Sequence, residues 1–590
     1  MNLISLIIEN TIKIPTHRAL SFQIGEHWET YTWKELWIEI SKTANGLTQI
    51  GTKKGDCVGI FSQNSKDWLI FDLAVQSIGA VTVPIYATNN MEQTNFIIRQ
   101  TEMKSILVGD SAQFEIIKNI EKNLDTPLHI FTSYSLGEGI ENTYELKKWS
   151  RDFSSEYHYK EHSADDLATI IYTSGTTGVP KGVMLTHGSF SEVIKAHKLF
   201  FGIHHLQHKK SLAFLPLSHI FERSWSLFVL SQGGEVAVLS DPKNVLNALK
   251  SVQPHSLCAV PRFYEKVYQT LIKKIESASP SKQKIFKKAL ETGKSYAEKI
   301  QYGEKIPLML ELKYTLFKTL VFNKIKKELG GNLSFLPVGG AALKKEISEF
   351  FAAIGMPVIV GYGLTETTAT VTAYPPKNFK HGSVGKTLPG VEIKIGNEDE
   401  ILVKYGGVMK GYYKNTEETE KVFTEDGYFR TGDAGMIDEE GNLFITDRIK
   451  DLMKTSNGKY IAPQVIEVPL QSHPEISQAM VVAEGKPYVA AFIVPDFESL
   501  IAQYQEFKNY ISSSIEEKKK LLETPFIKEK FEKIVSDIQK ELASFEKIKK
   551  FTLLPEEFSI EKGELTPTLK IRRKTVMENL HTEIERFYRE

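Results

Sequence analysis

Short apolar runs alternate with amphipathic stretches from about residue 55 onward, and this alternation restricts the fold more than any other feature of the chain. The runs are CVGIFS, SILVGD, LHIFTS, LATIIYTSG, SLAFLP, LSFLPVGG and MPVIVGYG, and several of them precede a segment with helical periodicity. Apolar strands that alternate with helices are typical of parallel sheets covered on both faces. The sequence therefore predicts an α/β fold with ligands bound beyond the carboxyl ends of the strands.

Length and composition exclude several classes of protein. A chain of 590 residues is too long for a single core, because domains usually hold roughly 100 to 200 residues. Its 73 basic and 73 acidic side chains leave no net charge to attract nucleic acid, so we expect no nucleic-acid partner. No uncharged stretch is apolar enough for a transmembrane helix, and MNLISLIIENTIKIP lacks the basic region of a signal peptide, so we expect a cytoplasmic protein.

Two changes in composition divide the chain. Residues 271–330 form a helical stretch with 14 Lys, 6 Glu and no Asp or Arg, which leaves a local charge of +8. This insert is either a solvated helix surface or a basic surface for anionic lipid headgroups or an anionic substrate. Short alternating runs and a mixed-charge helical region follow Arg448. We therefore predict a large N-terminal domain over residues 1–449, with mostly parallel sheets, and a small α+β domain over residues 450–590.

The segment ATIIYTSGTTGVPKGV carries the strongest local signal for a ligand. Its glycines let successive backbone N–H groups point into one concavity that can hold a polyphosphate, while hydroxyl groups and a lysine add donors and positive charge. The glycine spacing does not match G-x-x-x-x-G-K-[ST], so we do not expect a P-loop NTPase. The predicted phosphate-binding residues are Thr173, Ser174, Gly175, Thr176, Thr177, Gly178 and Lys181.

This segment resembles the phosphate-loop motif of the AMP-forming acyl-CoA synthetases, the adenylate-forming enzymes that include long-chain fatty acid CoA ligases. Seven further segments resemble family motifs in the same order along nearly the whole chain: FLPLSHIFERS, VPRFYEKVY, FLPVGGAAL, GYGLTETT, YFRTGDAG, DRIKDLMKTSNGKYIAPQVIE and LTPTLKIRRK. VPRFYEKVY, the DRIKD form and the lysine-rich insert resemble the long-chain class more than acetate, aromatic-acid or peptide-synthetase relatives. The resemblance implies the adenylate-forming fold, in which the small C-terminal domain is mobile.

GYGLTETT and FLPVGGAAL each follow an apolar run, so we expect Gly361 to Thr365 to form a turn at a strand end. Tyr362 offers a flat face for an adenine ring, Thr365 can donate to the α-phosphate, and Glu366 can hold Mg²⁺ together with phosphate oxygens. The resemblance implies the same roles, and the alternative for Glu366 is a surface carboxylate. The residues predicted to line the nucleotide pocket in these two motifs are Gly339, Gly340, Ala341, Gly361, Tyr362 and Gly363.

Asp433 in YFRTGDAG and Arg448 in DRIKD are implied by the resemblance to hold the ribose of the nucleotide. We expect Asp433 on a turn that presents its carboxylate to two hydroxyl groups, and Arg448 to supply a cationic donor fork. The alternative for both residues is a surface ion pair, which would contribute little to stability.

The resemblance also implies roles in the C-terminal domain. An ammonium group brought to the α-phosphate stabilises the charge that develops as a carboxylate attacks, and Lys570 in LTPTLKIRRK matches the catalytic lysine of the family. By the same resemblance, Lys450 is the hinge and Gly458 lets pantetheine pass close to the backbone. A hairpin turn at Asn457-Gly458 is the alternative for Gly458, and both readings can hold together.

Two further residues are assigned to the acyl site. His219 in FLPLSHIFERS is expected beside the acyl group, and Trp225 is expected along the acyl tunnel. Because a His and a Trp next to an apolar strand are often core residues, packing in the core is the alternative for both.

The sequence therefore predicts a long-chain fatty acid CoA ligase with ATP and CoA as co-substrates and Mg²⁺ as cofactor. A fatty carboxylate attacks ATP to give acyl-AMP and pyrophosphate, and CoA then accepts the acyl group and releases AMP. Three alternatives stay open: a fatty acyl-AMP ligase that loads a carrier protein, a non-catalytic nucleotide- or lipid-binding relative, and a structural protein. The sequence also leaves open a peripheral membrane contact through the insert and a homodimer.

Overall fold

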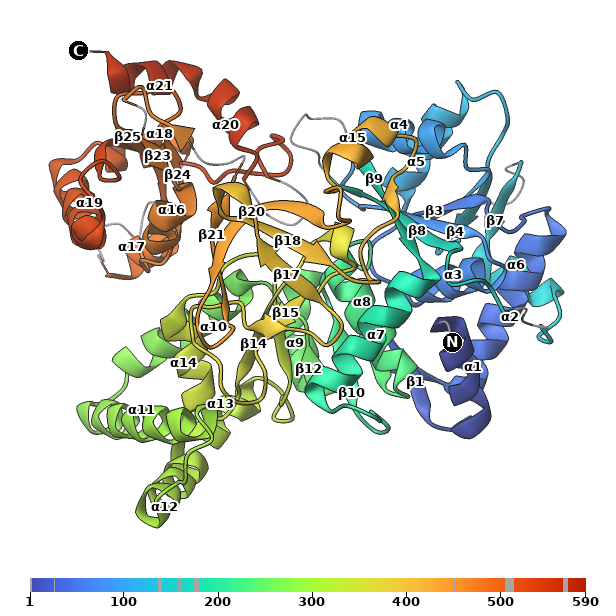
Figure 1. Cartoon of the computed structure of the whole chain (residues 1–590), viewed down its shortest axis with the longest axis horizontal. Coiled ribbons are helices and arrows are strands. Elements are labelled where there is room, and N and C mark those ends of the chain that lie inside the picture. Colours follow the sequence, from blue (N-terminus) through green and yellow to red (C-terminus); the bar gives the residue numbers. More distant parts are fainter. Residues whose placement is uncertain are drawn as a thin grey trace. The chain divides into compact units, whose positions relative to one another are not determined.

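The computed structural model describes residues 3–25, 27–135, 141–157, 159, 161–173, 180–449, 453–457, 459–503, 514–565 and 571–589. Contacts within the chain group it into two compact units (Figure 1). Unit 1 comprises Met1–Lys394, Leu402–Thr431 and Ile437–Phe444, and unit 2 comprises Ile395–Ile401, Gly432–Met436 and Ile445–Glu590. The domain boundary expected between residues 449 and 450 stays a prediction.

The largest sheet of unit 1 has eight strands in the order β19-β9-β8-β4-β3-β5-β6-β7. The strands from β8 to β7 run parallel, whereas β9 pairs antiparallel with both β8 and β19. The mostly parallel sheet expected from the apolar runs is therefore confirmed. The bounds are β3 Cys57–Phe61, β4 Val81–Ile85, β5 Ser105–Val108, β6 His129–Thr132, β7 Thr143–Glu145, β8 Leu167–Thr173, β9 Lys181–Thr186 and β19 Gly411–Tyr412.

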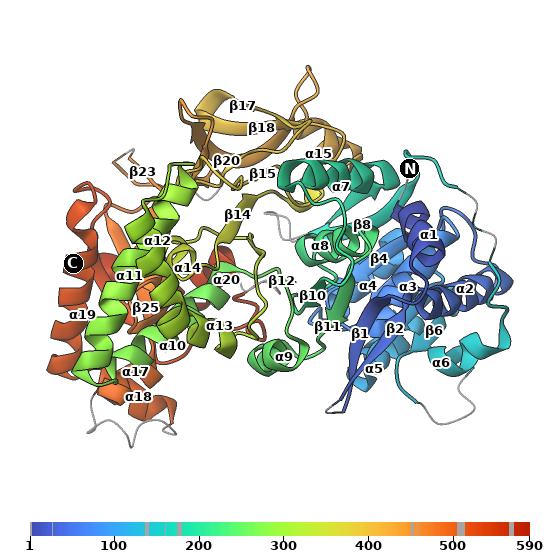
Figure 2. The same ribbon diagram turned by 90° about the horizontal axis from the view of Figure 1, so that it is seen from below.

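Helices cover both faces of this sheet (Figures 1 and 2). Helices α4 and α5 pack against the face that includes Val81, Val83 and Ile85 of β4. Helices α2 and α3 pack against the other face, which includes Val58 and Ile60 of β3. Both faces are apolar because both are covered, which explains why the strands read as continuous apolar runs. The helices are α1 Leu3–Lys13, α2 Trp33–Gln49, α3 Lys66–Ser77, α4 Met91–Thr101, α5 Ser111–Glu121, α6 Leu146–Trp149 and α7 His187–Phe201.

A second sheet of unit 1 has five strands in the order β12-β10-β11-β1-β2. All neighbours are parallel except the hairpin of β1 and β2. A third sheet has the order β13-β14-β15-β16, of which β13 and β14 are parallel. The bounds are β1 Arg18–Ile24, β2 His27–Thr32, β10 Lys210–Ala213, β11 Glu235–Val238, β12 Ser256–Leu257, β13 Leu336–Val338, β14 Val358–Tyr362, β15 Thr372–Ala373 and β16 Lys386–Thr387, with helices α8 Ile220–Ser231, α9 Val245–Val252, α14 Lys345–Ala353 and α15 Thr416–Lys421.

The lysine-rich insert is helical as expected, but it is divided into several helices. Pro280 begins one of them and Pro307 precedes the next, because proline lacks the backbone donor that a continuing helix needs. The elements are α10 Pro261–Glu276, α11 Pro280–Gln301, α12 Leu308–Phe317, a π-helical turn Lys318–Phe322 and α13 Asn323–Glu328. Among the described residues, no helix is both long enough and apolar enough to cross a lipid bilayer.

The C-terminal part of the chain combines a small sheet with helices. A four-stranded sheet of order β17-β18-β20-β21 comes first, and a three-stranded sheet of order β24-β25-β26 follows the β22-β23 hairpin. The runs QAMVVAE and YVAAFIVP form β24 and β25, as the alternation predicted. The bounds are β17 Glu392–Ile395, β18 Glu400–Lys404, β20 Phe429–Ile437, β21 Leu443–Arg448, β22 Met453–Lys454, β23 Tyr460–Ile461, β24 Ile476–Val482, β25 Val489–Pro495, β26 Ile548–Leu553, α16 Pro463–Gln471, α17 Phe497–Gln503, α18 Ile515–Leu522, α19 Pro525–Ile538, α20 Arg573–Asn579 and α21 His581–Tyr588.

A fully buried ion pair joins α3 to α8 inside unit 1. Arg223 and Asp72 both have 0% of their side chains exposed, and Arg223 Nε donates to Asp72 Oδ2 at 3.0 Å. Arg223 Nη1 also donates to Thr169 Oγ1 at 2.7 Å, and that hydroxyl donates to the carbonyl of Thr82 at 2.6 Å. The guanidinium is thus paired and hydrogen-bonded, which a buried charge requires.

We expect Asp72→Asn to lower the free energy of unfolding by about 3 to 5 kcal/mol, because it leaves the guanidinium of Arg223 buried without a counter-charge. The double variant Asp72→Leu/Arg223→Met should lose less than the sum of the two single changes. Urea titrations followed by circular dichroism measure both. Glu585→Gln, which breaks an exposed pair with Arg589, is the control and should leave the unfolding midpoint unchanged. A midpoint for Asp72→Asn equal to that of wild type would contradict the role of the pair.

Candidate active site

The ends of β13 and β14 and the start of α8 meet at one edge of the sheets. A Cβ atom on Gly339 would lie 3.7 Å from the carbonyl oxygen of Gly361 and 3.4 Å from Cζ of Phe221. His219 caps the same helix, where its Nδ1 accepts a hydrogen bond from the Phe221 N–H at 3.2 Å. Three of the segments singled out from the sequence therefore converge at the carboxyl ends of parallel strands, where ligands bind in such folds.

Gly340 and Ala341 lie exposed just beyond β13. Gly340 has a φ of +87°, in the left-handed region that favours glycine. This glycine therefore has a conformational reason to be there. The part of both residues in a nucleotide pocket stays a prediction.

The expectation of a turn from Gly361 to Thr365 is wrong for its first two residues. Gly361 and Tyr362 still belong to β14, because β15 returns antiparallel and pairs with both of them. Tyr362 is only 8% exposed. Gly363 follows the strand, and a Cβ atom on it would lie 1.3 Å from the carbonyl oxygen of Ala369. Close approach of the chain's own backbone therefore requires this glycine, whatever binds nearby.

Glu366 and Lys181 are brought together by a residue that the sequence did not single out. Tyr412 donates from its hydroxyl to Glu366 Oε1 at 3.0 Å, and the ammonium group of Lys181 lies 5.1 Å from the centroid of the same ring. Lys181 also forms an ion pair with Glu418 of α15. The contact arises because β19, which carries Tyr412, pairs with β9. No local pattern marks it, since Lys181 and Glu418 are 237 residues apart in sequence.

The contacts of this cluster shift the pKa values of Glu418 and Tyr412. Hydrogen bonding to Lys181 and to Lys421 lowers the pKa of Glu418 to about 2. Burial and the neighbouring carboxylate of Glu366 raise the pKa of the Tyr412 hydroxyl well above its usual value. Tyr412 is therefore a protonated donor to Glu366 across the neutral pH range.

Residues 405–409 hold the loop that carries Glu366 in place. The Met409 N–H donates to the carbonyl of Glu366 at 2.7 Å, and Thr368 Oγ1 donates to the carbonyl of Gly407 at 2.6 Å. Thr368 and Ala369 both adopt left-handed backbone, with φ of +49° and +79°. Such conformations cost about 1 to 3 kcal/mol each in a non-glycine residue, so surrounding bonds must maintain them. Glu366 therefore lies on a loop whose conformation is maintained by hydrogen bonds to residues 405–409.

The predicted phosphate loop is bounded by two strands. Thr173 ends β8 and Lys181 begins β9, and the two residues are partners in the antiparallel ladder. A strand rather than a helix follows the loop, which agrees with the exclusion of a P-loop NTPase. The other five predicted phosphate-binding residues lie outside the described residues: Ser174, Gly175, Thr176, Thr177 and Gly178.

Glu222 lies one turn beyond His219 and is completely buried. Its carboxyl group accepts hydrogen bonds from the Leu215 N–H at 3.2 Å and from Ser226 Oγ at 3.2 Å. Burial raises the pKa of Glu222 to about 8. Glu222 lies in the segment FLPLSHIFERS, but nothing in its local pattern indicated a buried carboxyl group.

Trp225 packs in the core of unit 1. Its Nε1 donates to Ser211 Oγ at 3.0 Å, and its ring stacks on Phe335 with centroids 5.2 Å apart and planes 4° apart. Only 6% of the residue is exposed. The core packing that was the alternative for Trp225 is confirmed, and its place along an acyl tunnel stays a prediction.

Unit 2 brings the two predicted ribose-binding residues together. Arg448 Nε lies 3.1 Å from Asp433 Oδ1, and Asp433 is 4% exposed. The expectation of a turn at Asp433 is wrong, because β20 continues through it. The carboxylate of the pair is almost completely covered, whereas 42% of the Arg448 side chain is exposed, so the pair is only half buried.

Three predicted residues of the C-terminal part lie outside the described residues: Lys450, Gly458 and Lys570. The hairpin expected around Gly458 is confirmed by its flanks. β22 and β23 pair antiparallel, and the Thr455 N–H donates to the carbonyl of Lys459 at 2.9 Å.

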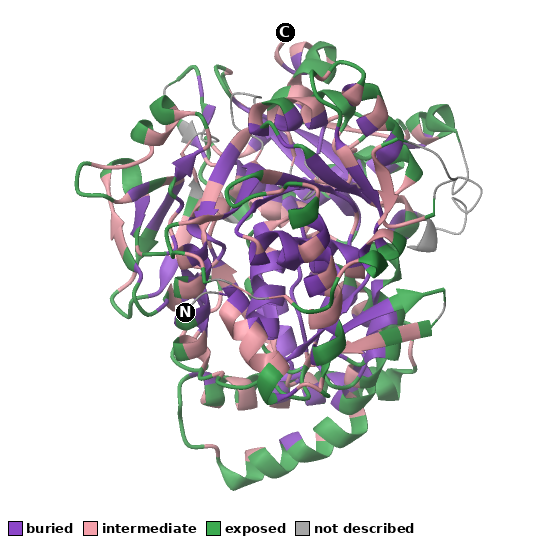
Figure 3. Ribbon diagram, turned by 90° about the vertical axis from the view of Figure 1, so that its right-hand side faces the viewer, coloured by how far each residue is buried: buried purple, intermediate pink, exposed green. Residues whose placement is uncertain are grey.

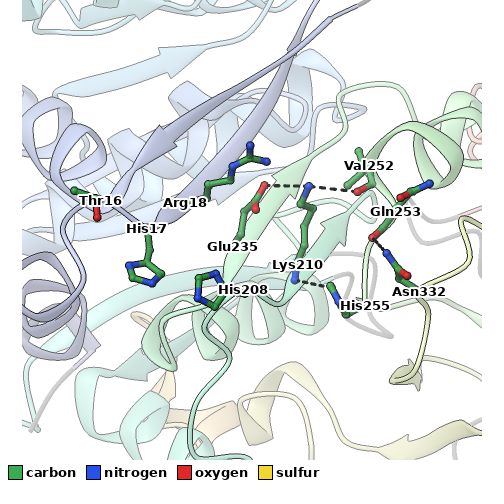
Figure 4. A pocket seen from close by; sticks show the side chains of 10 residues that line it. All are labelled: Thr16, His17, Arg18, His208, Lys210, Glu235, Val252, Gln253, His255 and Asn332. Carbon is green, nitrogen blue, oxygen red and sulfur yellow. Dashed lines mark hydrogen bonds and ion pairs between the residues drawn. The ribbon is translucent and has the colours of Figure 1, made fainter.

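A cavity of about 600 Å³ opens at the opposite edge of the five-stranded sheet (Figure 4). Arg18, Lys210 and Glu235 line it, and each is the first residue of its strand. Lys210 Nζ lies 3.5 Å from Glu235 Oε1. None of the predicted site residues lines this cavity.

The chain matches two family models and several known proteins along its length. The family model of the AMP-binding enzymes matches residues 9–413, and the model of the AMP-binding enzyme C-terminal domain matches residues 450–590. The chain belongs to the AMP-binding enzyme family. Among curated members of this family, the chain is 33% identical over 588 residues to the long-chain-fatty-acid–CoA ligase FadD15 of Mycobacterium bovis, covering 100% of this chain and 97% of the relative. It is 26% identical to the long-chain-fatty-acid–CoA ligase ACSBG2 of Homo sapiens, covering 98% of this chain and 91% of the relative.

Solved structures of AMP-binding enzymes share the fold. The anthranilate CoA ligase AuaEII in complex with anthranoyl-AMP superposes with a TM-score of 0.75 at 18% identity, over 99% of this chain and 98% of that one. The adenylation domain of a carboxylate reductase from Mycobacterium chelonae gives 0.77 at 20% identity, over 100% of this chain and 91% of that one. The predicted α/β fold of the adenylate-forming enzymes is confirmed. The enzyme class is confirmed as well: this AMP-binding enzyme is an AMP-forming acid–thiol ligase.

Stability should depend on pH through Glu222. The contribution of this residue is fully present below pH 4.5, the ordinary pKa of glutamate, and is lost as the pH rises to about 8, where the folded protein must hold a buried negative charge. We expect wild type to lose a few kcal/mol of unfolding free energy over this range, at about 1.4 kcal/mol for each pKa unit. Glu222→Gln should lack this part of the pH dependence. Urea titrations between pH 5 and 8.5 compare the two, and parallel curves would contradict the raised pKa.

Tyr412→Phe should weaken the use of Mg²⁺. The change removes the hydrogen bond to Glu366 but keeps the ring beneath the ammonium of Lys181. If Glu366 ligates Mg²⁺ as the sequence predicts, Tyr412 is the partner that orients its carboxylate, and we expect the Mg²⁺ concentration for half-maximal pyrophosphate release to rise about tenfold, with little change in Tm. Tyr413→Phe, at the neighbouring ring, is the matched control. An unchanged Mg²⁺ dependence in Tyr412→Phe would refute the positioning role.

Proposed function

We propose that this chain activates long-chain fatty acids with ATP and transfers them to CoA. The observation that carries the proposal is likeness along the full length to curated ligases with that name, in a chain that also has Lys181 and Glu366 joined through Tyr412. The Arabidopsis thaliana long-chain acyl-CoA synthetase 7 adds a relative at 29% identity over 96% of this chain and 82% of its own length.

In the first half-reaction the fatty carboxylate attacks the α-phosphorus of ATP, and pyrophosphate leaves with the electron pair of the broken P–O bond. Lys181 then binds phosphate oxygens, for which it exchanges its ion pair with Glu418. Thr365 donates to the α-phosphate. Asp433 and Arg448 hold the ribose, and Tyr362 and the glycines of the two loops line the adenine pocket.

Glu366 is the residue that would hold Mg²⁺. Its carboxylate is a hard oxygen ligand, and the Tyr412 hydroxyl orients it. Within the part of the chain that the structure describes, no group of three His, Cys, Asp or Glu side chains could hold a metal ion by itself. Glu366 would hold such an ion, and the ion would neutralise phosphate charge. One solved structure with a similar fold is that of the o-succinylbenzoate CoA synthetase of Bacillus subtilis in complex with ATP and magnesium ion.

In the second half-reaction the thiol of CoA attacks the acyl carbon, and AMP leaves. The C-terminal domain must serve both steps, since Lys570 is needed near the phosphates first and the Gly458 region near the thiol afterwards. We place the hinge for this change at Lys450. His219 lies beside the reacting acyl group and Trp225 along the acyl chain. A cytoplasmic location is part of the proposal, whereas membrane contact through the insert and a homodimer stay predictions.

Lys570→Ala tests the proposal. Because the lysine stabilises charge only as the carboxylate attacks, we expect pyrophosphate release with palmitate to fall by about a hundredfold or more, while transfer from supplied acyl-AMP to CoA is largely kept. Lys574→Ala, at an exposed lysine four residues away, is the matched control and should behave as wild type.

A panel of C2 to C20 acids, assayed for pyrophosphate and for acyl-CoA, tests the substrate class in the same experiment. Activity on acetate with none on palmitate would overturn the long-chain assignment. Pyrophosphate release without acyl-CoA would instead assign the chain to the acyl-AMP ligases that load a carrier protein.

A further inference from the structure

A stripe of large apolar side chains is exposed along α12 of the lysine-rich insert. An α-helix turns about 100° per residue, so positions 308, 312 and 316 of α12 fall on one side and position 309 lies next to them, while position 320 belongs to the π-helical turn that follows α12. Isolated exposed apolar residues need no explanation, but a contiguous group does. The members of the α12 stripe, with their exposed fractions, are Leu308 72%, Met309 63%, Leu312 57%, Leu316 56% and Leu320 49%.

The opposite face of α12 is already packed. Tyr314, the buried residue of this helix, stacks on Tyr296 of α11 with ring centroids 3.8 Å apart and planes 2° apart. Tyr314 also contacts Phe322, with centroids 5.8 Å apart. The helix is therefore attached to unit 1 by one apolar face and leaves the other in solvent. Figure 3 shows α12 as the lowest helix, almost entirely exposed, with α11 beside it in Figure 1.

Exposed lysines of the insert lie on and near α12, which also carries the exposed carboxylate of Glu311. Lys305, Lys313, Lys318 and Lys324 are exposed on or beside the helix. Among the residues that the structure describes, no carboxylate lies within ion-pair distance of any of these four ammonium groups. Their charge therefore remains available to an external anionic partner.

We propose that the α12 stripe inserts into the interface of an anionic membrane, with the exposed lysines of the insert, in which 14 Lys outnumber 6 Glu, drawn to the lipid headgroups. Apolar side chains beside lysines are the pattern of helices that lie in the membrane interface. At 10 residues, α12 is far too short to span a bilayer and suits a helix that lies along its surface. The inference rests on the proposed function in one respect: a long-chain fatty acid resides mainly in membranes, so a ligase docked there meets its substrate.

A second copy of the chain fits the same surface less well. A two-fold interface would place stripe on stripe and therefore lysine on lysine, and like charges repel. Five side chains on α12 and the turn after it also cover less than the roughly 800 Å² per partner of a stable interface. An anionic lipid surface instead attracts every lysine of the group.

Sedimentation with sucrose-loaded vesicles tests the proposal on the full-length protein. We expect wild type to bind vesicles of equimolar phosphatidylcholine and phosphatidylglycerol at least tenfold more tightly than vesicles of phosphatidylcholine alone. Leu312→Glu/Leu316→Glu should weaken binding to the anionic vesicles at least tenfold. Leu199→Glu is the matched control, because Leu199 of α7 is also 56% exposed but lies outside the insert, and it should change binding less than twofold. Lys313→Glu/Lys318→Glu should abolish the preference for anionic vesicles.

Activity assays keep this inference separate from the proposed function. Wild type and Leu312→Glu/Leu316→Glu should release pyrophosphate equally from palmitate carried on albumin, and only wild type should be faster with palmitate in anionic vesicles. Vesicle binding without any pyrophosphate release would overturn the proposed function alone. Absence of wild-type binding to anionic vesicles, or an equal loss in Leu199→Glu, would overturn the inference. So would a wild-type dimer that Leu312→Glu/Leu316→Glu dissociates in analytical ultracentrifugation, because the stripe would then bind a second copy.

Discussion

The buried contact between Arg223 and Asp72 is the constraint on which the arrangement of unit 1 depends. Burying two charges is costly unless each finds its partners. The Arg223 guanidinium also lies 5.5 Å from the ring centroid of Trp68 and 5.9 Å from that of Phe190. The pair joins α3, which covers the eight-stranded sheet, to α8, which follows a strand of the five-stranded sheet. His219 caps the start of α8, so the same contact holds the start of that helix at the edge where β13 and β14 end.

The proposed chemistry of the site follows from that arrangement. One tyrosine on a two-residue strand contacts both the carboxylate of Glu366 and the ammonium of Lys181. Lys181 has an internal carboxylate partner in Glu418, so its charge is paired before a polyphosphate competes for it. This ion pair reduces the free-energy cost of keeping the Lys181 ammonium partly buried. A ligand must therefore carry more negative charge than Glu418 to displace it.

Helix α12 of the lysine-rich insert has apolar side chains on two faces, and only one of these faces packs against unit 1. One face of α12 stabilises the fold through Tyr314 and its stacking on Tyr296. The other face contributes nothing to the fold of unit 1, and its exposure has a free-energy cost in water. We infer that this cost is recovered at a membrane, which would connect the acyl substrate to the enzyme that activates it.

The amino-acid sequence by itself determined the α/β class, the strands, the family and the positions of its motifs, because apolar runs and glycine-rich turns are local patterns. It could not place Gly361 and Tyr362 in a ladder with β15, nor Asp433 within β20, because strand pairing depends on segments that only the folded chain brings together. Tyr412 as the link to Glu366 and the α12 stripe were likewise decided by tertiary structure. The physical reason is the same in each case. The burial of a side chain and the pairing of a strand depend on neighbours that are distant in sequence, and the local sequence pattern does not indicate those neighbours.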